Sequence, residues 1–338
     1  MIDLSTDYLG LKLKNPLVPS ASPLSRNVDT ALRLEDAGAA ALVMYSLFEE
    51  ELRAEDAMTD RFLLHTGLGC SEAEDGFLPD LGELQSGLER YLSHLCQLKQ
   101  RLEIPVVASL NGVSPSGWVE LGCALEQAGA DALELNVYHV AADMQAAGEA
   151  VEARYIELLT ELRRVVNLPI VMKLSPFFSS LPHFVRQLEA AGANGVALFN
   201  RFYQPDIDLD QMCMTDQLHL STPEEALLRI RWIAILHGRI RLTLAATGGA
   251  HSEREALKLL LAGADVVHMA SCLLRHGPDR LTEMLAAMRH WMEEREYASV
   301  SQMKGSMSQK NLPDPSLVAR ASYLRVLDSF TTRPGVWS

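Results

Sequence analysis

A lysine inside an apolar run is the residue of this sequence most able to take part in chemistry. Lys173 lies in the run PIVMKLS at 169–175. Burying a lysine is costly unless its ammonium group meets negative charge. We interpret Lys173 as a cation placed beside a bound group that gains negative charge. A lysine that reaches solvent at a strand end, or one that pairs with a carboxylate such as Glu134, would also explain the pattern.

Two pairs of small residues predict a phosphate-binding site. Gly248-Gly249 follows an apolar run and precedes a helix that begins near Ser252, and Ala270-Ser271 follows the next apolar run. Small residues let the backbone approach a phosphate closely, and the N–H groups at a helix start can donate to it. One glycine pair is more often a simple turn. Two such sites in successive loops favour phosphate binding.

Short apolar runs alternate with amphipathic helical stretches along the chain. The runs end in polar or small residues, which is typical of parallel strands buried on both faces. Ala-Gly-Ala triplets recur before several runs, where glycine ends the preceding helix. The pattern predicts an α/β protein, a (β/α)8 TIM barrel. An open doubly wound sheet is the alternative, because strand order is not visible in a sequence. The predicted strands are 16–22, 41–46, 105–111, 132–138, 169–175, 195–202, 241–249 and 266–272. The helices predicted between them include 114–129, 147–167, 180–192, 222–237 and 251–263.

Two long insertions and a C-terminal extension interrupt this alternation. The acidic stretch 47–83 follows the second predicted strand, and 203–221 follows the sixth. Both would lie at the C-terminal mouth of the barrel, where loops cover ligands, unless they are variable surface excursions. We expect one barrel domain over residues 1–300. Residues 301–338 should form a linker and a helix at 316–330 that packs on the barrel or on a partner subunit.

The composition is that of a globular protein with an acidic surface. The chain has 338 residues, 48% of them hydrophobic, and a formal net charge of −14. Without a basic patch, nucleic acid is not an expected partner. No apolar run has transmembrane length and the N-terminus does not resemble a signal peptide, so we expect a cytoplasmic protein. The five cysteines form no CxxC pair and the histidines have no metal-binding spacing, so neither an iron–sulfur cluster nor a metal site is predicted.

The sequence resembles the class 1 dihydroorotate dehydrogenases from about Leu4 to about Met307. The opening LSTDYLGLKLKNPLVPSAS is similar to that family's hairpin, which closes the barrel floor, followed by its Ala-Ser flavin contact. MKLSP, with Lys173, resembles the family's flavin lysine. The strongest similarity is to the FMN-phosphate segment, in GGAHSEREALKLLLAGADVVHMASCLLRHGP, and EREYASVSQMKG resembles the closing helix. Each motif is weak alone, but their order and spacing along the barrel make the set specific.

The resemblance implies FMN as the cofactor and suggests a homodimer. Lys173 would lie near the N1–C2=O region of the flavin, where a cation stabilises the reduced, anionic ring. The residues that would contact FMN are Ala21, Ser22, Ser46, Asn111, Asn136, Lys173, Gly248, Gly249, Ala270 and Ser271.

The residues expected around the substrate differ from the family pattern. Class 1 enzymes have a Lys-Ser pair after the second strand, whereas here Tyr45 replaces the lysine. Their catalytic cysteine loop, Asn-Leu-Ser-Cys-Pro-Asn, is replaced by NVYHVA at 136–141, and the serine of their Asn-Ser pair after the sixth strand by Arg201. The acidic insertion replaces the Asn- and Gly-rich stretch that contacts orotate. These differences predict an FMN enzyme with a substrate other than dihydroorotate.

His139 aligns with the position of the family's catalytic base. Histidine suits proton transfer near neutral pH, and the alternative is an ordinary loop histidine in a chain that has lost its chemistry. Tyr45 and Tyr138 would donate hydrogen bonds to a substrate carbonyl or act as stacked wall residues. Asn200 and Arg201 complete the predicted substrate site. Arg201 would pair with a substrate carboxylate or form a salt bridge with the acidic insertion.

The sequence thus predicts an FMN-dependent oxidoreductase that acts on a CH–CH group next to a carbonyl in a small-molecule substrate. Electrons would pass to a small acceptor or to a separate redox protein, because the chain has no cysteine set for a cluster. Three alternatives remain open. They are an authentic dihydroorotate dehydrogenase of pyrimidine biosynthesis, a non-catalytic flavin-binding or regulatory subunit, and a lyase or isomerase that binds a sugar phosphate.

Overall fold

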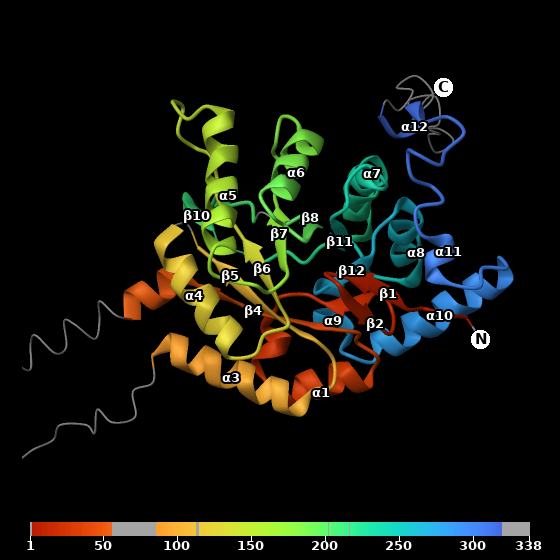
Figure 1. Cartoon of the computed structure of the whole chain (residues 1–338), viewed down its shortest axis with the longest axis horizontal. Helices are drawn as coiled ribbons and strands as arrows, with labels where there is room; N and C mark the ends of the chain where they lie inside the picture. Colours follow the sequence, from red (N-terminus) through yellow and green to blue (C-terminus); the bar gives the residue numbers. More distant parts are fainter. Residues whose placement is uncertain (1, 56–85, 113–114, 202, 216, 320–338) are drawn as a thin grey trace, which may run out of the picture.

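Eight parallel strands form one sheet that curves into a barrel. The structure is a computed structural model and describes residues 2–55, 86–112, 115–201, 203–215 and 217–319 (Figure 1). Neighbouring strands follow the order β3-β12-β11-β8-β7-β6-β5-β4, so each strand lies beside the next barrel strand in the chain. The strands are β3 (Leu17–Pro19), β4 (Leu42–Phe48), β5 (Val106–Asn111), β6 (Ala132–Asn136), β7 (Ile170–Leu174), β8 (Gly195–Leu198), β11 (Thr243–Thr247) and β12 (Val266–Met269).

The two ends of this sheet meet. The backbone N–H of Ala40, just before β4, donates to the carbonyl of Leu17 in β3 at 3.1 Å. On its other side β3 pairs in parallel with β12, the last strand. An open doubly wound sheet would instead reverse its strand order at a switch point. The predicted (β/α)8 barrel is therefore confirmed, and each strand overlaps its predicted apolar run.

Helices cover the outside of the barrel and several begin at capping residues. Ser86, Thr222 and Ser252 form capping boxes with the glutamates three residues later, which satisfies N–H groups that the helix itself cannot pair. Thr222 begins a short turn, η3 (Pro223–Glu225), that leads into the next helix, as predicted. The helices around the barrel are α1 (Val28–Asp36), α3 (Gly87–Arg101), α4 (Pro115–Gln127), α5 (Gly148–Arg163), α6 (Leu181–Ala190), α7 (Ala226–Leu236), α8 (Glu253–Ala262), α9 (Ser271–His276) and α10 (Arg280–Glu294).

The N-terminal hairpin closes the floor of the barrel, as predicted. Its strands β1 (Thr6–Tyr8) and β2 (Leu11–Leu13) pair antiparallel. Tyr8 and Leu13 are buried against small apolar side chains of the barrel interior, among them Val171. These small residues leave room for the larger hairpin side chains, because the interior of a barrel of this size must be filled.

Both predicted insertions begin after the C-terminal end of a strand, the first after β4 and the second after β8. Leu47 is buried and continues β4, and residues 49–55 are helical, so the first insertion begins later than predicted. Most of it, residues 56–85, lies outside the described part of the chain. The second insertion contains an antiparallel hairpin of β9 (Asp206–Asp208) and β10 (Cys213–Thr215).

The segment that follows the barrel, predicted to be a linker, packs on the helices. It begins with α11 (Val300–Met303). The N–H of Gly305 then donates to the carbonyl of Leu260 in α8 at 3.0 Å. The helix predicted at 316–330 begins as α12 (Ser316–Ala319), and the rest of it lies outside the described residues.

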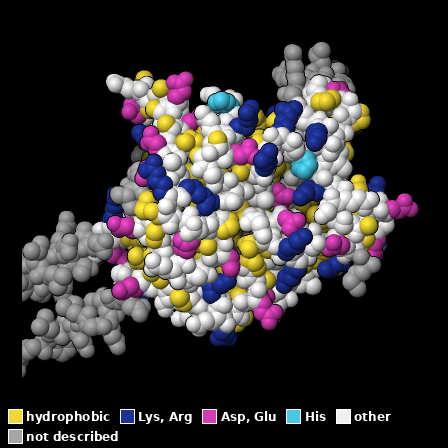
Figure 2. All heavy atoms as spheres, in the orientation of Figure 1, with side chains coloured by type: hydrophobic (Ala, Val, Ile, Leu, Met, Phe, Trp, Pro, Cys, Tyr) yellow, Lys and Arg dark blue, Asp and Glu magenta, His cyan; other side chains and the backbone are white. Residues whose placement is uncertain are grey.

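The outer surface has side chains of both charges. On the face drawn in Figure 2, Lys and Arg side chains are interspersed with Asp and Glu side chains. Among the helices that the structure describes, none is long and apolar enough to cross a membrane.

Candidate active site

The C-terminal ends of the barrel strands border one continuous cleft. It has two lobes, with cavity volumes of about 240 Å³ and 650 Å³. Ala21, Ser22, Lys173 and Asn200 line both lobes, so one opens into the other. The smaller lobe extends to the loops after β11 and β12, and the larger lobe to the ends of β4, β5 and β6. Barrel enzymes place their active sites at this end of the strands.

The glycine pair after β11 shapes the smaller lobe. Gly248 and Gly249 have φ angles of 92° and 86°, a region that favours glycine. A Cβ at Gly249 would lie 2.3 Å from the backbone nitrogen of Ala226 in α7, and one at Gly248 would lie 2.9 Å from Nη2 of Arg229. Both positions therefore require glycine, for the conformation of the turn and for its contact with α7.

Ser221 is a lining residue of the smaller lobe that the sequence did not predict. Its N–H donates to Oγ of Ser271 at 3.0 Å, and its Oγ lies 3.0 Å from Nε2 of His251. The predicted cofactor residues Ala270 and Ser271 line the same lobe. The sequence indicated only that a helix begins at Ser221 or Thr222, with a glutamate three residues later. An insertion separates Ser221 from β8, so its place in the cleft was not visible in the pattern.

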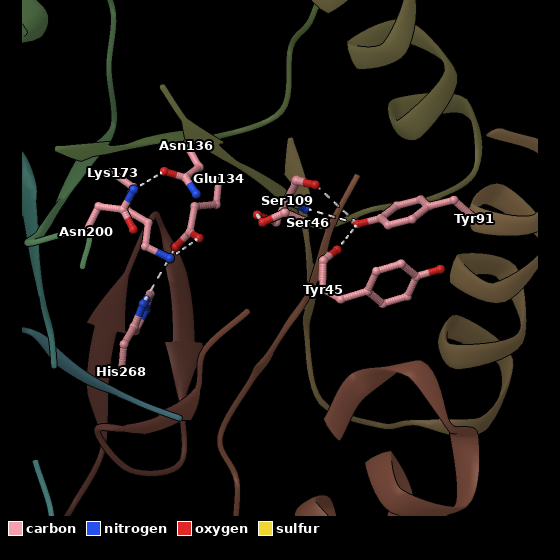
Figure 3. Close-up of polar contacts among 9 residues, drawn as sticks. All are labelled: Tyr45, Ser46, Tyr91, Ser109, Glu134, Asn136, Lys173, Asn200 and His268. Atoms are coloured by element: carbon pink, nitrogen blue, oxygen red, sulfur yellow. Dashed lines mark hydrogen bonds and ion pairs between the residues drawn. The ribbon is translucent and has the colours of Figure 1, made fainter. Parts of the chain in front are cut away.

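Lys173 lies on the floor of the cleft, between the two lobes. Its Nζ is 3.1 Å from Oε1 of Glu134 in β6, and the two side chains are 8% and 0% exposed (Figure 3). The pairing with Glu134, one of the alternatives raised by the sequence, is therefore present. Lys173 also lines both lobes, so the same ammonium group can face a bound ligand.

Amide and hydroxyl side chains at the strand ends line the larger lobe. Nδ2 of Asn200 donates to Oδ1 of Asn136 at 2.5 Å, and Oγ of Ser46 lies 2.9 Å from Oγ of Ser109 (Figure 3). Asn111 lines the same lobe. The structure thus brings together Ser46, Asn111, Asn136 and Asn200, which the sequence placed after four different strands.

Tyr45 forms a wall of the larger lobe. Its N–H donates to Oγ of Ser25 at 2.6 Å, and its carbonyl accepts from the hydroxyl of Tyr91 at 3.0 Å. The guanidinium of Arg26, which the sequence did not single out, lies 5.1 Å from the centroid of the Tyr45 ring. Burial raises the pKa of Tyr45, so the hydroxyl stays protonated at neutral pH and can donate to a ligand.

Arg201 lines both lobes and pairs with a carboxylate of the protein. Its Nη2 lies 3.4 Å from Oε1 of Glu225, whose Oε2 lies 3.7 Å from Nη2 of Arg229. The sequence left a substrate carboxylate and the acidic insertion as possible partners. Within the described residues the partner is instead Glu225, which the capping turn at Thr222 brings to the cleft.

The loop between β6 and α5 points two predicted site residues into different cavities. Tyr138 lines the larger lobe of the cleft. His139 lines a separate cavity of about 260 Å³ together with Tyr155, and its Nε2 lies 3.3 Å from Nη1 of Arg154. To act on a ligand in the cleft, His139 would have to turn out of this second cavity. Its acid/base role remains a prediction.

The cleft suits flavin mononucleotide. Gly248, Gly249, Ala270 and Ser271 line the smaller lobe with small side chains, as expected where a phosphate approaches the backbone. Lys173 offers a buried cation at the junction of the lobes, and amide groups border the larger lobe. All the predicted FMN residues line one lobe or both.

Comparisons with known proteins point to one family. The sequence model of the family described as dihydroorotate dehydrogenase matches residues 3–292. The catalytic subunit of dihydroorotate dehydrogenase B (NAD(+)) from Thermoplasma acidophilum is 24% identical over 311 residues, covering 90% of this chain and 99% of the relative. Its counterpart from Methanosarcina acetivorans is 25% identical, covering 88% and 93%. Dihydroorotate dehydrogenase A (fumarate) from Lactobacillus delbrueckii subsp. bulgaricus is 26% identical, covering 83% and 90%.

The family match spans most of the chain, and the relatives align along nearly their whole length. The strands and loops that form the cleft lie inside the matched region. The chain therefore belongs to the dihydroorotate dehydrogenase family, whose members are FMN-dependent oxidoreductases that act on CH–CH groups.

Proposed function

We propose that this chain holds FMN in the cleft and oxidises or reduces a C–C bond next to a carbonyl, in a substrate other than dihydroorotate. The observation that supports FMN binding is that one continuous cleft gathers every predicted flavin residue. When bound, FMN supplies the group that exchanges an electron pair with the substrate. The protein's own residues hold, orient and enclose the two molecules.

In this proposal the smaller lobe holds the FMN phosphate and the larger lobe holds the substrate. In the smaller lobe Gly248, Gly249, Ser221 and Ser271 would hold the FMN phosphate, because their small side chains and N–H groups suit a phosphate. Lys173 would place its positive charge beside the ring. In the larger lobe, donors with protonated hydroxyl or amide groups would orient a substrate carbonyl, which lowers the barrier by fixing its geometry.

The residues around the larger lobe support a substrate other than dihydroorotate. Tyr45, Tyr138 and Tyr203 line it. Arg201 is already paired with Glu225, and His139 faces another cavity. A ligand whose polar groups lack partners in such a site binds poorly, since each unsatisfied group costs about 1–3 kcal/mol.

The alternative is an authentic dihydroorotate dehydrogenase, and the names of the relatives favour it. Anaerobic mixing of the FMN-loaded protein with dihydroorotate separates the two. We expect slow and incomplete bleaching of the flavin at any concentration. Rapid bleaching at low concentration would show that the altered cleft performs the family's named reaction. A flavin that no small reductant bleaches would instead indicate a non-catalytic flavin-binding subunit.

A separate redox protein is a further part of the proposal. The relatives from Thermoplasma acidophilum and Methanosarcina acetivorans are named as catalytic subunits. This chain has no CxxC pair for a cluster of its own. Tyr203 and Leu218, which line the cleft, are 58% and 63% exposed, so a partner reaching the mouth would meet apolar side chains. A small acceptor that turns the isolated chain over at full rate would remove the need for a partner.

A further inference from the structure

Four buried polar atoms beneath the cleft have no hydrogen-bond partner within the described residues. They are the hydroxyl oxygen of Tyr8, Oε2 of Glu134, and Nδ1 and Nε2 of His268. Tyr8 and Glu134 are fully buried, and His268 is 1% exposed. Buried polar atoms in proteins are nearly always paired, with the protein or with trapped water. A cluster of them directly below a binding cleft points to a role beyond packing.

Glu134 contacts both Lys173 and His268 through its carboxylate (Figure 3). One carboxylate oxygen, Oε1, is 3.1 Å from Nζ of Lys173, and the other, Oε2, is 3.7 Å from Nδ1 of His268. The ring of Tyr8, from the floor hairpin, meets the His268 ring edge-on with the centroids 5.7 Å apart. The cluster therefore joins β1, β6, β7 and β12 inside the barrel.

This cluster is in electrostatic contact with the cleft. His268 and Lys173 both line the smaller lobe. On the other side, the apolar layer of the barrel floor surrounds Tyr8. Charges interact strongly in such surroundings because there is little water to screen them. Negative charge placed in the cleft beside Lys173 therefore acts on the whole cluster.

The cluster is electrically neutral before any such change. The ammonium of Lys173 and the carboxylate of Glu134 cancel. Burial lowers the pKa of His268 to about 4, Glu134 opposes this shift, and Lys173 adds to it. Burial raises the pKa of Tyr8 well above its ordinary value. Glu134, Lys173 and Tyr8 are the titratable groups that face His268 in the described chain. At neutral pH the His268 ring is therefore uncharged, and one of its nitrogens is free to take a proton.

We propose that His268 and Glu134 form a proton-accepting pair that takes up one proton when the flavin beside Lys173 is reduced. The inference rests on the proposed function, because reduced FMN is the source of the new negative charge. The substrate gives up two electrons and two protons. Both electrons and one proton would go to the flavin, leaving it anionic, and the other proton would leave the cleft to solvent. The ring of His268 then takes up one proton from solvent in response to the new negative charge, and donates to Oε2 of Glu134. Lys173 links the two events because its single positive charge faces both the reduced flavin and Glu134 and can balance only one of them, so a protonated His268 balances the other.

A purely structural cluster would behave differently. Trapped water would then satisfy the four atoms, and their protonation would not depend on the redox state of the flavin. The flavin would account for every proton taken up on reduction.

The FMN-loaded wild-type protein separates the two cases. The midpoint potential is measured against pH near neutrality, and the absorption spectrum of the reduced flavin shows whether its ring is anionic or neutral. Each proton taken up with two electrons contributes about 30 mV per pH unit. We expect a slope of about 60 mV per pH unit together with an anionic spectrum. A slope of about 30 mV per pH unit, or a neutral reduced flavin, overturns the proposal.

Two variants assign the second proton to a residue. In His268→Gln, which cannot take it up, the slope should fall to about 30 mV per pH unit while the reduced flavin stays anionic. Tyr8→Phe is the matched control. It removes one of the four unpaired polar atoms but leaves the proton-accepting ring of His268 in place, so it should keep the wild-type slope. An unchanged slope in His268→Gln, or a reduced slope in both variants, contradicts the assignment. A protein that binds no FMN contradicts the proposed function instead.

Discussion

The ion pair of Lys173 and Glu134 is difficult to explain by stability alone. Both side chains are almost completely buried, and removing two charges from water costs several kcal/mol for each ion. Apolar side chains of similar volume would often give an equally stable barrel. Lys173 lines the cleft, whereas Glu134 lies wholly inside the barrel. The carboxylate therefore makes it possible to keep a positive charge at the floor of a binding site.

Replacing one partner of this pair should have a large effect. Lys173→Met should lower the free energy of unfolding by about 3–5 kcal/mol, because Glu134 is then a buried charge without a counter-ion. Adding Glu134→Gln should restore much of that loss. Urea unfolding of the FMN-free proteins measures both values. Lys12→Met is the control, since Lys12 and Asp7 form an exposed pair and should contribute almost nothing. Equal losses in Lys173→Met and Lys12→Met would contradict this account of the pair.

His139 and Tyr138 are adjacent in sequence but face different cavities, so their variants test which of them acts on the substrate. We expect His139→Ala to slow flavin reduction by a confirmed substrate about 10²–10⁴-fold, because the loop must bring the ring into the cleft for proton transfer. Stopped-flow absorbance measures the rate, and FMN affinity should not change. An unaffected rate in His139→Ala, with a loss in Tyr138→Phe, would show that the tyrosine is the donor and the histidine an ordinary loop residue.

The turn between β11 and α8 owes its shape to its contact with α7. Gly249→Ala should weaken FMN binding at least about tenfold, a loss of about 1.4 kcal/mol, because the new Cβ would lie 2.3 Å from the backbone nitrogen of Ala226. Gly129→Ala is the matched control. Gly129 also has a positive φ of 90°, but nothing lies within 4 Å of its added Cβ. Both variants strain the backbone, because both glycines have a positive φ. Only Gly249→Ala should also displace the turn between β11 and α8, through the clash with Ala226. Equal FMN affinity in both, measured by fluorescence titration, would show that this turn does not hold the phosphate.

The elements were predictable from the sequence to the extent that each is a local pattern. Buried strands appear as apolar runs, and Thr222 and Glu225 mark a helix start by their spacing. Contacts across the barrel have no such signal. His268 is a single polar residue in VVHMAS, and closure of the barrel is what brings it to Glu134. The direction of His139 depends on the conformation of one loop, which no periodic pattern determines.

At the scale of the whole molecule, the closed barrel leaves the β9–β10 hairpin projecting beside the cleft mouth. The hairpin exposes four large apolar side chains. They are Ile207, Leu209, Met212 and Met214, which are 58%, 80%, 81% and 60% exposed. Neighbouring exposed apolar side chains commonly mark a protein interface.

We expect the chain to be a homodimer at micromolar concentration, with this hairpin in the interface. The double variant Leu209→Asp/Met212→Asp should sediment as a monomer, because dimerisation would bury two unpaired carboxylates. Leu227→Asp is the control, since Leu227 is 63% exposed on α7 and should leave the dimer intact. A monomeric wild-type protein would contradict the expected dimer, and a dimeric double variant would place the interface elsewhere.

Binding of FMN by the purified chain tests the function of the cleft most directly. We expect the protein to be yellow as purified, or to bind one equivalent of added FMN with quenching of the flavin fluorescence. Gly249→Ala should bind more weakly in the same titration. Sugar phosphates without a flavin ring should not displace the cofactor, because Lys173 and the amides of the larger lobe would hold the ring as well as the phosphate. A colourless, folded wild-type protein that leaves the fluorescence of added FMN unchanged would contradict the assignment of this cleft as a flavin site.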